Sequence, residues 1–343
     1  MGLQISEIIP KKEMEIHDLK GKTLAVDAFN VIYQFLSSIR QPDGTPLTDS
    51  KGRITSHLSG LFYRNINLLQ EGIKLIYVFD GKPPALKNAT RELREEAKDE
   101  AREKYEKAVE EEDIEAMGKY ARQLTKLDKE KIEESKELLR AMGIAVVEAP
   151  SEGEAQASYI SKKENEVYAI ASQDYDCLLF EAPYLIQNLT LARKRKTVSG
   201  YVEIKPQLIE LENVLKELEI NQEQLICIGI LCGTDYNAGG VKGIGPKKAL
   251  KLVKEFKTKE KIFEKISEFE KEGKYKLEFD WMEIFELMKH PDIDKNYKIE
   301  FPKINLSRIK EILVEHDFSE ERIDNQLSKL NELKEAKKQR TLF

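Results

Sequence analysis

The chain is poor in the residues that build disulfide frameworks and zinc sites. It has three cysteines, Cys177, Cys227 and Cys232, and no two of them form a CxxC pair. Each stands within or beside an apolar run, so we expect reduced cysteines that pack in the core. The four histidines are scattered, with no HxxxH or HExxH spacing, which argues against zinc-dependent hydrolysis.

Long apolar segments and targeting signals are also missing. No apolar run approaches the roughly 18 residues that a membrane-spanning helix needs, and no signal-peptide pattern follows Met1. We therefore expect a cytoplasmic protein without a membrane partner. The P-loop pattern GxxxxGK[ST] occurs nowhere, which disfavours nucleotide hydrolysis of that type.

Net positive charge is lacking as well, because the 343 residues carry a net charge of −6. This value argues against general attraction to nucleic acid, although local patches rather than net charge decide such binding. With 41% hydrophobic residues, the chain can bury a sizeable core as one large or two smaller domains.

Apolar runs of strand length occur at residues 23–26, 75–79, 145–147 and 168–171, and helical patterns separate them. This alternation predicts an α/β fold with a mostly parallel central sheet flanked by helices. Residues 28–39 follow helical spacing and lead to a turn at residues 41–44. The highly charged residues 87–136 lack an apolar stripe and predict exposed helices, and helical pattern returns from about Lys205.

Acidic residues follow the apolar segments. Asp27, Asp80 and Asp174 come after strand-like runs, and Asp235 follows the apolar run that ends at Cys232. In open α/β sheets, ligand sites lie beyond the carboxyl ends of the strands. We therefore expect these carboxylates to meet in one crevice.

Three more acids extend this set, and each has a structural alternative. Glu152 and Glu154 lie in Ser151-Glu152-Gly153-Glu154, which also fits a capping box at a helix start. Asp174 and Asp176 fit a turn or helix cap equally well. In an extended chain, these two aspartates would face one side and Tyr175 the other.

So many carboxylates in one crevice would repel each other unless a cation neutralised them. Oxygen ligands without a histidine or cysteine cluster favour Mg²⁺ or Mn²⁺ over zinc. The sequence thus points to two-metal hydrolysis of a phosphoester.

A glycine-rich hairpin separates the phosphodiester from the phosphomonoester alternative. Gly243 and Gly245 flank Ile244, and Pro246 opens a helix whose backbone N–H groups can hold a phosphate. Lys242, Lys247 and Lys248 add positive charge. This pattern is similar to a helix-hairpin-helix motif that binds the DNA backbone; a glycine cap before a solvated helix is the alternative.

Five blocks together resemble the flap structure-specific endonucleases of the 5′-nuclease superfamily: LAVDAFNVIYQFL, VFDGKPPALK, EAPSEGEAQA, SQDYDCLLF and GTDYNAGGVKGIGPKKA. The resemblance implies a 5′ flap endonuclease with 5′–3′ exonuclease activity. Such an enzyme cuts branched DNA at the base of single-stranded 5′ flaps, in lagging-strand replication and long-patch base excision repair. A non-catalytic junction-binding module and a Mg²⁺-dependent phosphatase, with Asp174 or Asp176 as nucleophile, are the alternatives.

The resemblance also implies roles for individual residues. Two Mg²⁺ ions, with Mn²⁺ as a substitute, would be held by Asp27, Asp80, Glu152, Glu154, Asp174, Asp176 and Asp235. Lys87 and Arg94 would polarise the scissile phosphate, with Arg91 on the same helix face at i, i+4 and i+7, and Tyr33 would stack on a base. A monovalent cation at the hairpin is left open.

We expect one nuclease domain over residues 1–330 and a tail over residues 331–343. The domain would comprise an N-terminal region (about 1–100), a helical arch or cap (about 84–136) and an internal region (about 137–260) that includes the hairpin motif (236–256). Residues 55–64 resemble a helix that meets the duplex junction, and residues 193–196 form a basic run.

The tail matches a sliding-clamp-binding motif only in part. Gln339, Leu342 and Phe343 correspond to it, but the paired aromatic anchors are incomplete. A truncated chain or partial use of Phe343 would both explain the mismatch. We expect a monomer that binds branched DNA and leave clamp binding open.

Overall fold

A seven-stranded mixed sheet forms the centre of the molecule, and its spatial order is β1-β9-β6-β5-β2-β3-β4. The computed structural model describes residues 3–41, 44–111, 113–190, 194–197 and 200–340. The strands of the sheet are β1 (Lys12–Glu13), β2 (Thr23–Asp27), β3 (Lys74–Phe79), β4 (Ala145–Glu148), β5 (Val167–Ala171), β6 (Tyr184–Gln187) and β9 (Gln207–Glu210). A separate hairpin is formed by β7 (Lys194–Thr197) and β8 (Gly200–Glu203).

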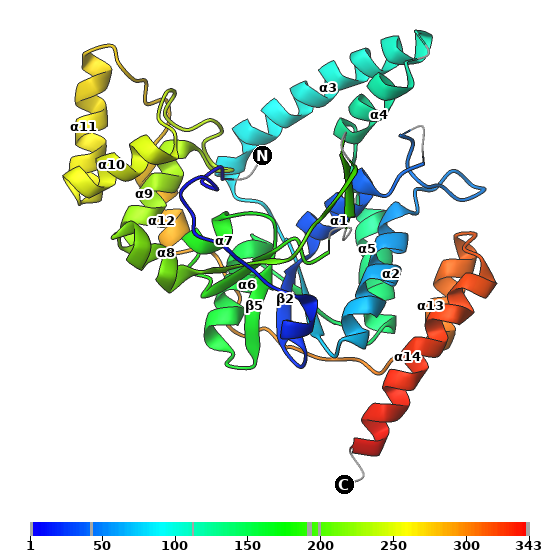
Figure 1. Cartoon of the computed structure of the whole chain (residues 1–343). Helices are drawn as coiled ribbons and strands as arrows, with labels where there is room; N and C mark the ends of the chain where they lie inside the picture. Colours follow the sequence, from blue (N-terminus) through cyan, green and yellow to red (C-terminus); the bar gives the residue numbers. More distant parts are fainter. Residues whose placement is uncertain (1–2, 42–43, 112, 191–193, 198–199, 341–343) are drawn as a thin grey trace.

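Helices cover the sheet and extend from it (Figure 1). The first half of the chain forms α1 (Ala28–Ser38), α2 (Ser56–Gln70), α3 (Asn88–Glu110), α4 (Ile114–Gln123), α5 (Lys129–Ala141), α6 (Gly153–Lys163) and α7 (Asp176–Leu179). The second half forms α8 (Leu211–Leu218), α9 (Gln222–Cys232), α10 (Pro246–Phe256), α11 (Lys259–Lys271), α12 (Trp281–Lys289), α13 (Leu306–Glu315) and α14 (Glu320–Arg340). Two 3₁₀ turns, η1 (Ile16–Leu19) and η2 (Ala85–Lys87), complete the set.

The predicted parallel sheet is confirmed. Strands β2 to β6 pair in parallel, whereas β9 and β1 add an antiparallel edge. Residues along β2 and β3 alternate between two buried cores: Ala25 and Ile76 pack in one, Val26 and Tyr77 in the other. Both faces are therefore covered, which explains why these strands read as continuous apolar runs.

One expectation about the second half needs correction. Helical structure was expected from about Lys205, but β9 (Gln207–Glu210) comes first and pairs with β6. Strands β9 and β1 span only four and two residues, which is too short for a periodic pattern to reveal them. The cysteine expectation holds, because Cys177 and Cys227 are buried free thiols and Cys232 is a partly buried one.

Helices α3 and α4 form a hairpin that stands away from the sheet (Figure 1). Among the α3 side chains that the structure describes, the buried apolar ones are small, Ala101 and Ala108, which fits the missing apolar stripe. Helix α5 differs, because it packs on α2 and β4 and buries Leu138 and Leu139. Residues 129–136, which the expected arch included, thus lie in a helix of the main body.

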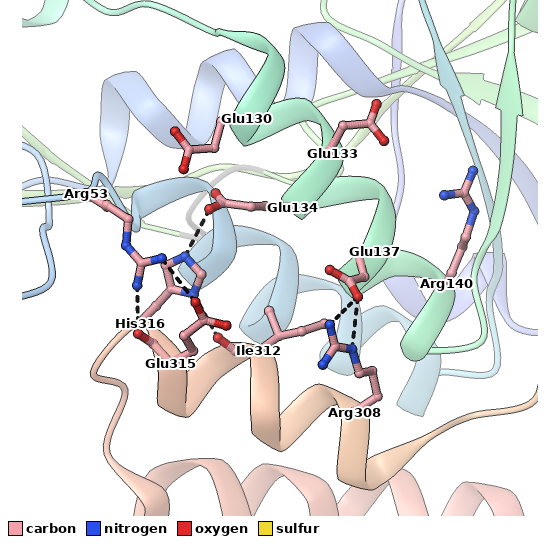
Figure 2. A pocket seen from close by; sticks show the side chains of 10 residues that line it. All are labelled: Arg53, Glu130, Glu133, Glu134, Glu137, Arg140, Arg308, Ile312, Glu315 and His316. Atoms are coloured by element: carbon pink, nitrogen blue, oxygen red, sulfur yellow. Dashed lines mark hydrogen bonds and ion pairs between the residues drawn. The ribbon is translucent and has the colours of Figure 1, made fainter. Parts of the chain in front are cut away.

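The C-terminal helices dock on the body through α2 and α5. Glu134 on α5 accepts hydrogen bonds from His57 (2.9 Å) and His316 (3.0 Å), and so joins α2, α5 and the end of α13. Figure 2 shows the groove beside this contact, where acidic side chains alternate with Arg53, Arg140 and Arg308. None of the residues that line the groove belongs to the predicted acidic cluster. We therefore interpret the groove as part of the interface between the C-terminal helices and the main body.

Within the part of the chain that the structure describes, no helix is long and apolar enough to cross a membrane.

Candidate metal and nucleic-acid site

The predicted acids lie at the carboxyl ends of neighbouring parallel strands. Asp27 ends β2, Asp80 follows β3, and Asp174 follows β5. The chain order runs outward from β2 to β3 and β4 on one side and from β5 to β6 on the other. The acids therefore meet where the strand order reverses, the usual place for ligand sites in open α/β sheets.

Asp27 is fixed by its own helix and by the neighbouring strand. Its side chain caps α1 by accepting a hydrogen bond from the backbone N–H of Asn30 (3.0 Å). The hydroxyl of Ser172 donates to the other carboxylate oxygen (3.0 Å), while Ser172 Oγ accepts from the N–H of Asp174 (3.1 Å). Ser172 thus links the acids of β2 and β5.

The start of α6 differs from the capping box that the sequence suggested. Helix α6 begins at Gly153 with Glu152 as its N-cap, and the Glu152 side chain makes no capping hydrogen bond. Instead, the N–H of Gly153 donates to Asp80 Oδ1 (2.8 Å), so an acid from β3 caps the helix. Glu152 is therefore free to turn toward Lys87.

The extended geometry expected for residues 174–176 is wrong. Tyr175 has helical backbone angles (φ −80°, ψ −10°) and begins the short helix α7. Tyr175 is buried in the core, while burial and, after it, the carboxylate of Asp174 raise the pKa of Asp176. In this turn, the backbone N–H of Asp176 donates a hydrogen bond to Asp174 Oδ1 (3.4 Å).

The carboxylates of this site are buried close to one another and repel each other electrostatically. Burial and neighbouring acids raise the pKa of Asp80 to about 7 and that of Asp174 to about 6. Burial raises the pKa values of Asp27, Glu154 and Asp176 as well, and nearby carboxylates add to the effect for the last two. Such shifts arise when like charges share a poorly solvated site.

Two cations from the base of α3 enter this cluster. Lys87 Nζ lies 2.6 Å from Glu152 and 3.4 Å from Asp235, and Arg94 lies 2.6 Å from Asp235. Burial opposes the charged form of Lys87, but Glu152 and Asp235 outweigh it and raise its pKa. Burial alone would raise the pKa of Asp235. The positive charges of Lys87 and Arg94 outweigh burial and lower this pKa.

The helix-face argument for these basic residues applies only in part. Lys87 belongs to the turn η2, and α3 starts one residue later. Lys87 and Arg94 nevertheless reach the same carboxylate, whereas Arg91 is exposed, and no ion pair to it appears among the described residues.

Tyr236 is a residue of this site that the sequence did not reveal. It directly follows Asp235, is 6% exposed, and its hydroxyl has no hydrogen-bond partner among the described residues. Its ring centroid lies 5.6 Å from Lys87 Nζ, and burial, followed by the charges of Glu152 and Asp176, raises its pKa. Only its adjacency to Asp235 could have indicated it.

The donor set fits hard divalent cations. Asp176 Oδ1 is buried without a hydrogen-bond partner, which leaves an oxygen available for a cation. As placed, however, no three acidic, histidine or cysteine side chains in the described ranges stand close enough to enclose an ion. Glu152 and Asp235 are instead neutralised by Lys87 and Arg94.

The glycine-rich hairpin is formed as expected between α9 and α10. Gly243 has φ +89°, a conformation that glycine adopts without strain, and Gly245 caps α10 with Pro246 at its start. Lys242, Lys247 and Lys248 are all exposed around it. Lys248 Nζ donates to the carbonyl of Gly243 (2.9 Å), which brings positive charge to the turn.

The remaining predicted residues lie elsewhere. Tyr33 on α1 is 41% exposed, and its hydroxyl donates to the carbonyl of Thr125 (3.4 Å) at the base of α4. Gln339 lies in α14, whereas Leu342 and Phe343 fall outside the described residues. Arg193 of the basic run also lies outside them.

Comparisons with known proteins agree with this geometry. The chain matches the XPG N-terminal domain over residues 2–101 and the XPG I-region over residues 143–235. It is 53% identical to flap endonuclease 1 of Pyrococcus abyssi, over 100% of this chain and 97% of that protein.

Among solved structures, flap endonuclease-1 from Methanococcus jannaschii matches with a TM-score of 0.76 and 42% identity, over 98% of this chain and 100% of that one. The catalytic core of Rad2 in complex with DNA substrate shares the fold, with a TM-score of 0.69 and 24% identity over 96% of this chain and 100% of that one. The chain belongs to the flap endonuclease 1 family.

Proposed function

We propose that this chain is a structure-specific 5′ flap endonuclease with 5′–3′ exonuclease activity. It hydrolyses phosphodiester bonds at the base of single-stranded 5′ flaps on branched DNA, in lagging-strand replication and long-patch base excision repair. One observation carries the proposal: Lys87 and Arg94, at the base of the α3–α4 hairpin, pair directly with two of the predicted acids, Glu152 at the start of α6 and Asp235 after α9. Phosphate-binding cations and metal-binding carboxylates thus meet at one point.

We further propose that the site holds two Mg²⁺ ions, for which Mn²⁺ can substitute. Their ligands, direct or through water, would be Asp27, Asp80, Glu152, Glu154, Asp174, Asp176 and Asp235. When bound, such ions polarise the scissile phosphate and supply a hydroxide nucleophile at neutral pH. The raised pKa values of Glu154 and Asp176 and the unpartnered Asp176 Oδ1 support this assignment.

The basic residues contribute charge at the phosphate. Lys87 is held protonated by Glu152 and Asp235, so it is a permanent cation at the edge of the acidic cluster. A scissile phosphate that reaches this edge can replace a carboxylate as the partner of Lys87 or Arg94. Both cations then stabilise the negative charge that develops during hydrolysis, as preorganised donors do.

Other parts of the fold serve to place the DNA. The hairpin at Gly243 and Gly245, with Lys242, Lys247 and Lys248, would bind duplex phosphates through backbone N–H groups and charge. Tyr33 and Arg91 would contact the strand next to the cut, under the arch formed by α3 and α4. We assign residues 1–330 to this nuclease unit and keep the tail from residue 331 as a candidate sliding-clamp contact.

A double-flap DNA substrate tests the function. With Mg²⁺, the purified protein should release the 5′ flap by a cut near the junction, and chelation by EDTA should abolish the cut. Asp176→Ala should keep DNA binding while losing cleavage. Normal binding without any cleavage in Mg²⁺ or Mn²⁺ would reduce the protein to a junction-binding module, and turnover of p-nitrophenyl phosphate would instead favour a phosphatase.

A further inference from the structure

An extended segment after α12 runs along the helix that carries two of the acids. We call residues 290–305 the strap; it has no helix or strand of its own and leads to α13. Figure 1 shows it, in orange, passing beneath the sheet toward the C-terminal helices. A segment without regular structure must find other partners for its backbone groups.

One side chain of α6 binds the strap backbone at both of its hydrogen-bonding groups. Gln156 Oε1 accepts from the N–H of Asp294 (2.8 Å), and Gln156 Nε2 donates to the carbonyl of Asp294 (2.9 Å). Gln156 is fully buried, at 0% exposure. The two bonds fix both ends of the amide, so the position of this side chain relative to the strap is fully specified.

Further contacts hold the strap along the rest of α6. The hydroxyl of Tyr297 donates to Glu164 at the end of the helix (2.6 Å), and its ring packs edge-on against Tyr159 (6.1 Å between centroids). Ile293 and Ile299 pack on the same core as the apolar side of α6. The strap therefore follows α6 from its first turn to its C-cap.

Gln156 lies immediately behind the acids that α6 presents. Its backbone N–H donates to the carbonyl of Glu152 (3.1 Å), in the same first turn that contains Glu154. Asp80 also fixes this turn, because its carboxylate accepts a hydrogen bond from the N–H of Gly153. The first turn of α6 is thus fixed between Asp80, the residue after β3, and the strap.

We propose that Gln156 is a positioning residue for the acidic site: by binding the strap, it sets where α6 presents Glu152 and Glu154. The proposal rests on the metal site put forward under Proposed function. It makes the strap, a segment nearly 140 residues later in the chain, part of the scaffold of that site. Residues that orient ligands from behind commonly tune metal affinity.

The variant Gln156→Met tests this role, because methionine keeps the volume but makes neither bond to Asp294. Tyr297→Phe is the matched control, since it removes one bond between the strap and the far end of α6 and keeps the ring packing. The first readout needs no DNA and no catalysis: the rise in unfolding temperature as Mg²⁺ is titrated into the protein.

We expect Gln156→Met to need about tenfold more Mg²⁺ than the wild type for half of that rise, and Tyr297→Phe to match the wild type. DNA affinity measured in EDTA should stay unchanged in both variants. An unchanged Mg²⁺ midpoint for Gln156→Met, or an equal shift for Tyr297→Phe, would overturn the proposal.

Hydrogen exchange at residues 153–157 is the second readout, and it separates this proposal from the metal site. Exchange there should be faster in Gln156→Met than in Tyr297→Phe, even if Mg²⁺ fails to stabilise the wild type. Equal exchange in the two variants would refute the positioning role. Should Gln156→Met not fold, Gln156→Glu keeps the acceptor for the N–H of Asp294 and should shift both readouts in the same direction.

Discussion

The contact of Glu134 with two histidines should make the docking of the C-terminal helices depend on pH. His316 Nδ1 bonds the carbonyl of Ile312 (2.8 Å) and its Nε2 bonds Glu134 (3.0 Å). Because both partners are acceptors, the doubly protonated ring satisfies both bonds. The variant Glu134→Gln tests this dependence, because its amide can still bond a neutral His316 but carries no charge to pair with a protonated one.

The directions of the two pKa shifts determine how the stability of the folded protein changes with pH. The hydrogen bond to Glu134 raises the pKa of His316 above 6.5, so its contribution to stability is complete below pH 6.5 and is lost as pH rises through the folded value. Burial would raise the pKa of Glu134, but both histidines outweigh it and lower it from 4.5 to about 2. That contribution is present above pH 4.5 and lost as pH falls toward 2.

Loss of the Glu134 carboxylate also destabilises the folded protein at low pH through His57. Burial lowers its pKa, and Glu134 is the group that opposes the effect, with Lys131 and His316 lowering it further. Without the Glu134 carboxylate, protonation of His57 becomes still less favourable in the folded protein. The variant is then penalised further below pH 6.5, where the unfolded chain binds this proton. Arg53 only partly offsets the raised pKa of His316.

The size of the effect follows from the Glu134 shift. The fall in the pKa of Glu134 from 4.5 to about 2 corresponds to about 3 kcal/mol of unfolding free energy while its histidine partners are charged. A neutral hydrogen bond contributes about 1 kcal/mol. We therefore expect Glu134→Gln to lower stability by about 3 kcal/mol near pH 5.5 and by at most about 1 kcal/mol near pH 9, where the amide can keep the bond to His316. For a chain of this length, the larger loss lowers the unfolding temperature by about 4 °C.

Thermal unfolding followed by circular dichroism at both pH values measures the difference. Glu137→Gln, on the same helix, is the control, because its pair with Arg308 is roughly half exposed (50% and 44%) and should contribute less than about 1 kcal/mol at either pH. If the gap between wild type and Glu134→Gln were equal at the two pH values, or larger at alkaline pH, the charged Glu134–His316 pair would be ruled out as its cause.

Three further predictions concern the site and the core. Asp176→Asn should lower cleavage by about 100-fold and raise the unfolding temperature in EDTA, because a buried acid with an unpartnered oxygen becomes neutral; a cleavage rate like the wild type's would remove it from the site. Lys87→Ala should lower turnover by about 100-fold with little change in DNA affinity, whereas the exposed Arg91→Ala should change turnover far less; equal losses of turnover and affinity for Lys87→Ala would indicate simple phosphate binding. Gly60→Ala should destabilise the protein by about 1–3 kcal/mol in urea denaturation, because the added Cβ would lie 2.2 Å from the ring of Phe35; an unchanged midpoint would show that the helices shift without cost.

Sequence alone predicted the parts of this fold that have a strong period or a buried run. Strands β2, β3, β4 and β5 lie where the apolar segments placed them, and Asp27, Asp80 and Asp174 lie at or just beyond the ends of three of them. The helix start near Glu152 was predicted, but its cap was not, because the cap comes from Asp80, more than 70 residues away, rather than from a local residue. Tertiary contacts of this kind leave no local pattern to read.

The same distinction applies within the site. Lys87 and Arg94 were found through motif resemblance, but their pairing with Glu152 and Asp235 depends on how α3 meets the turn after α9. Tyr236 and Gln156 have no spacing that sets them apart from ordinary core residues. Their roles become visible only from an unpartnered hydroxyl and from a side chain bonded twice to a distant backbone.

The ion pairs at the base of α3 have a thermodynamic consequence. Lys87 and Arg94 neutralise Glu152 and Asp235 when no other charge is near. An arriving phosphate competes for these cations, and every carboxylate that it releases becomes a stronger ligand for a divalent ion. DNA and metal should then each tighten the binding of the other, and reciprocity requires the same factor in both directions. The enzyme would thereby assemble its most reactive state only when its substrate is in place.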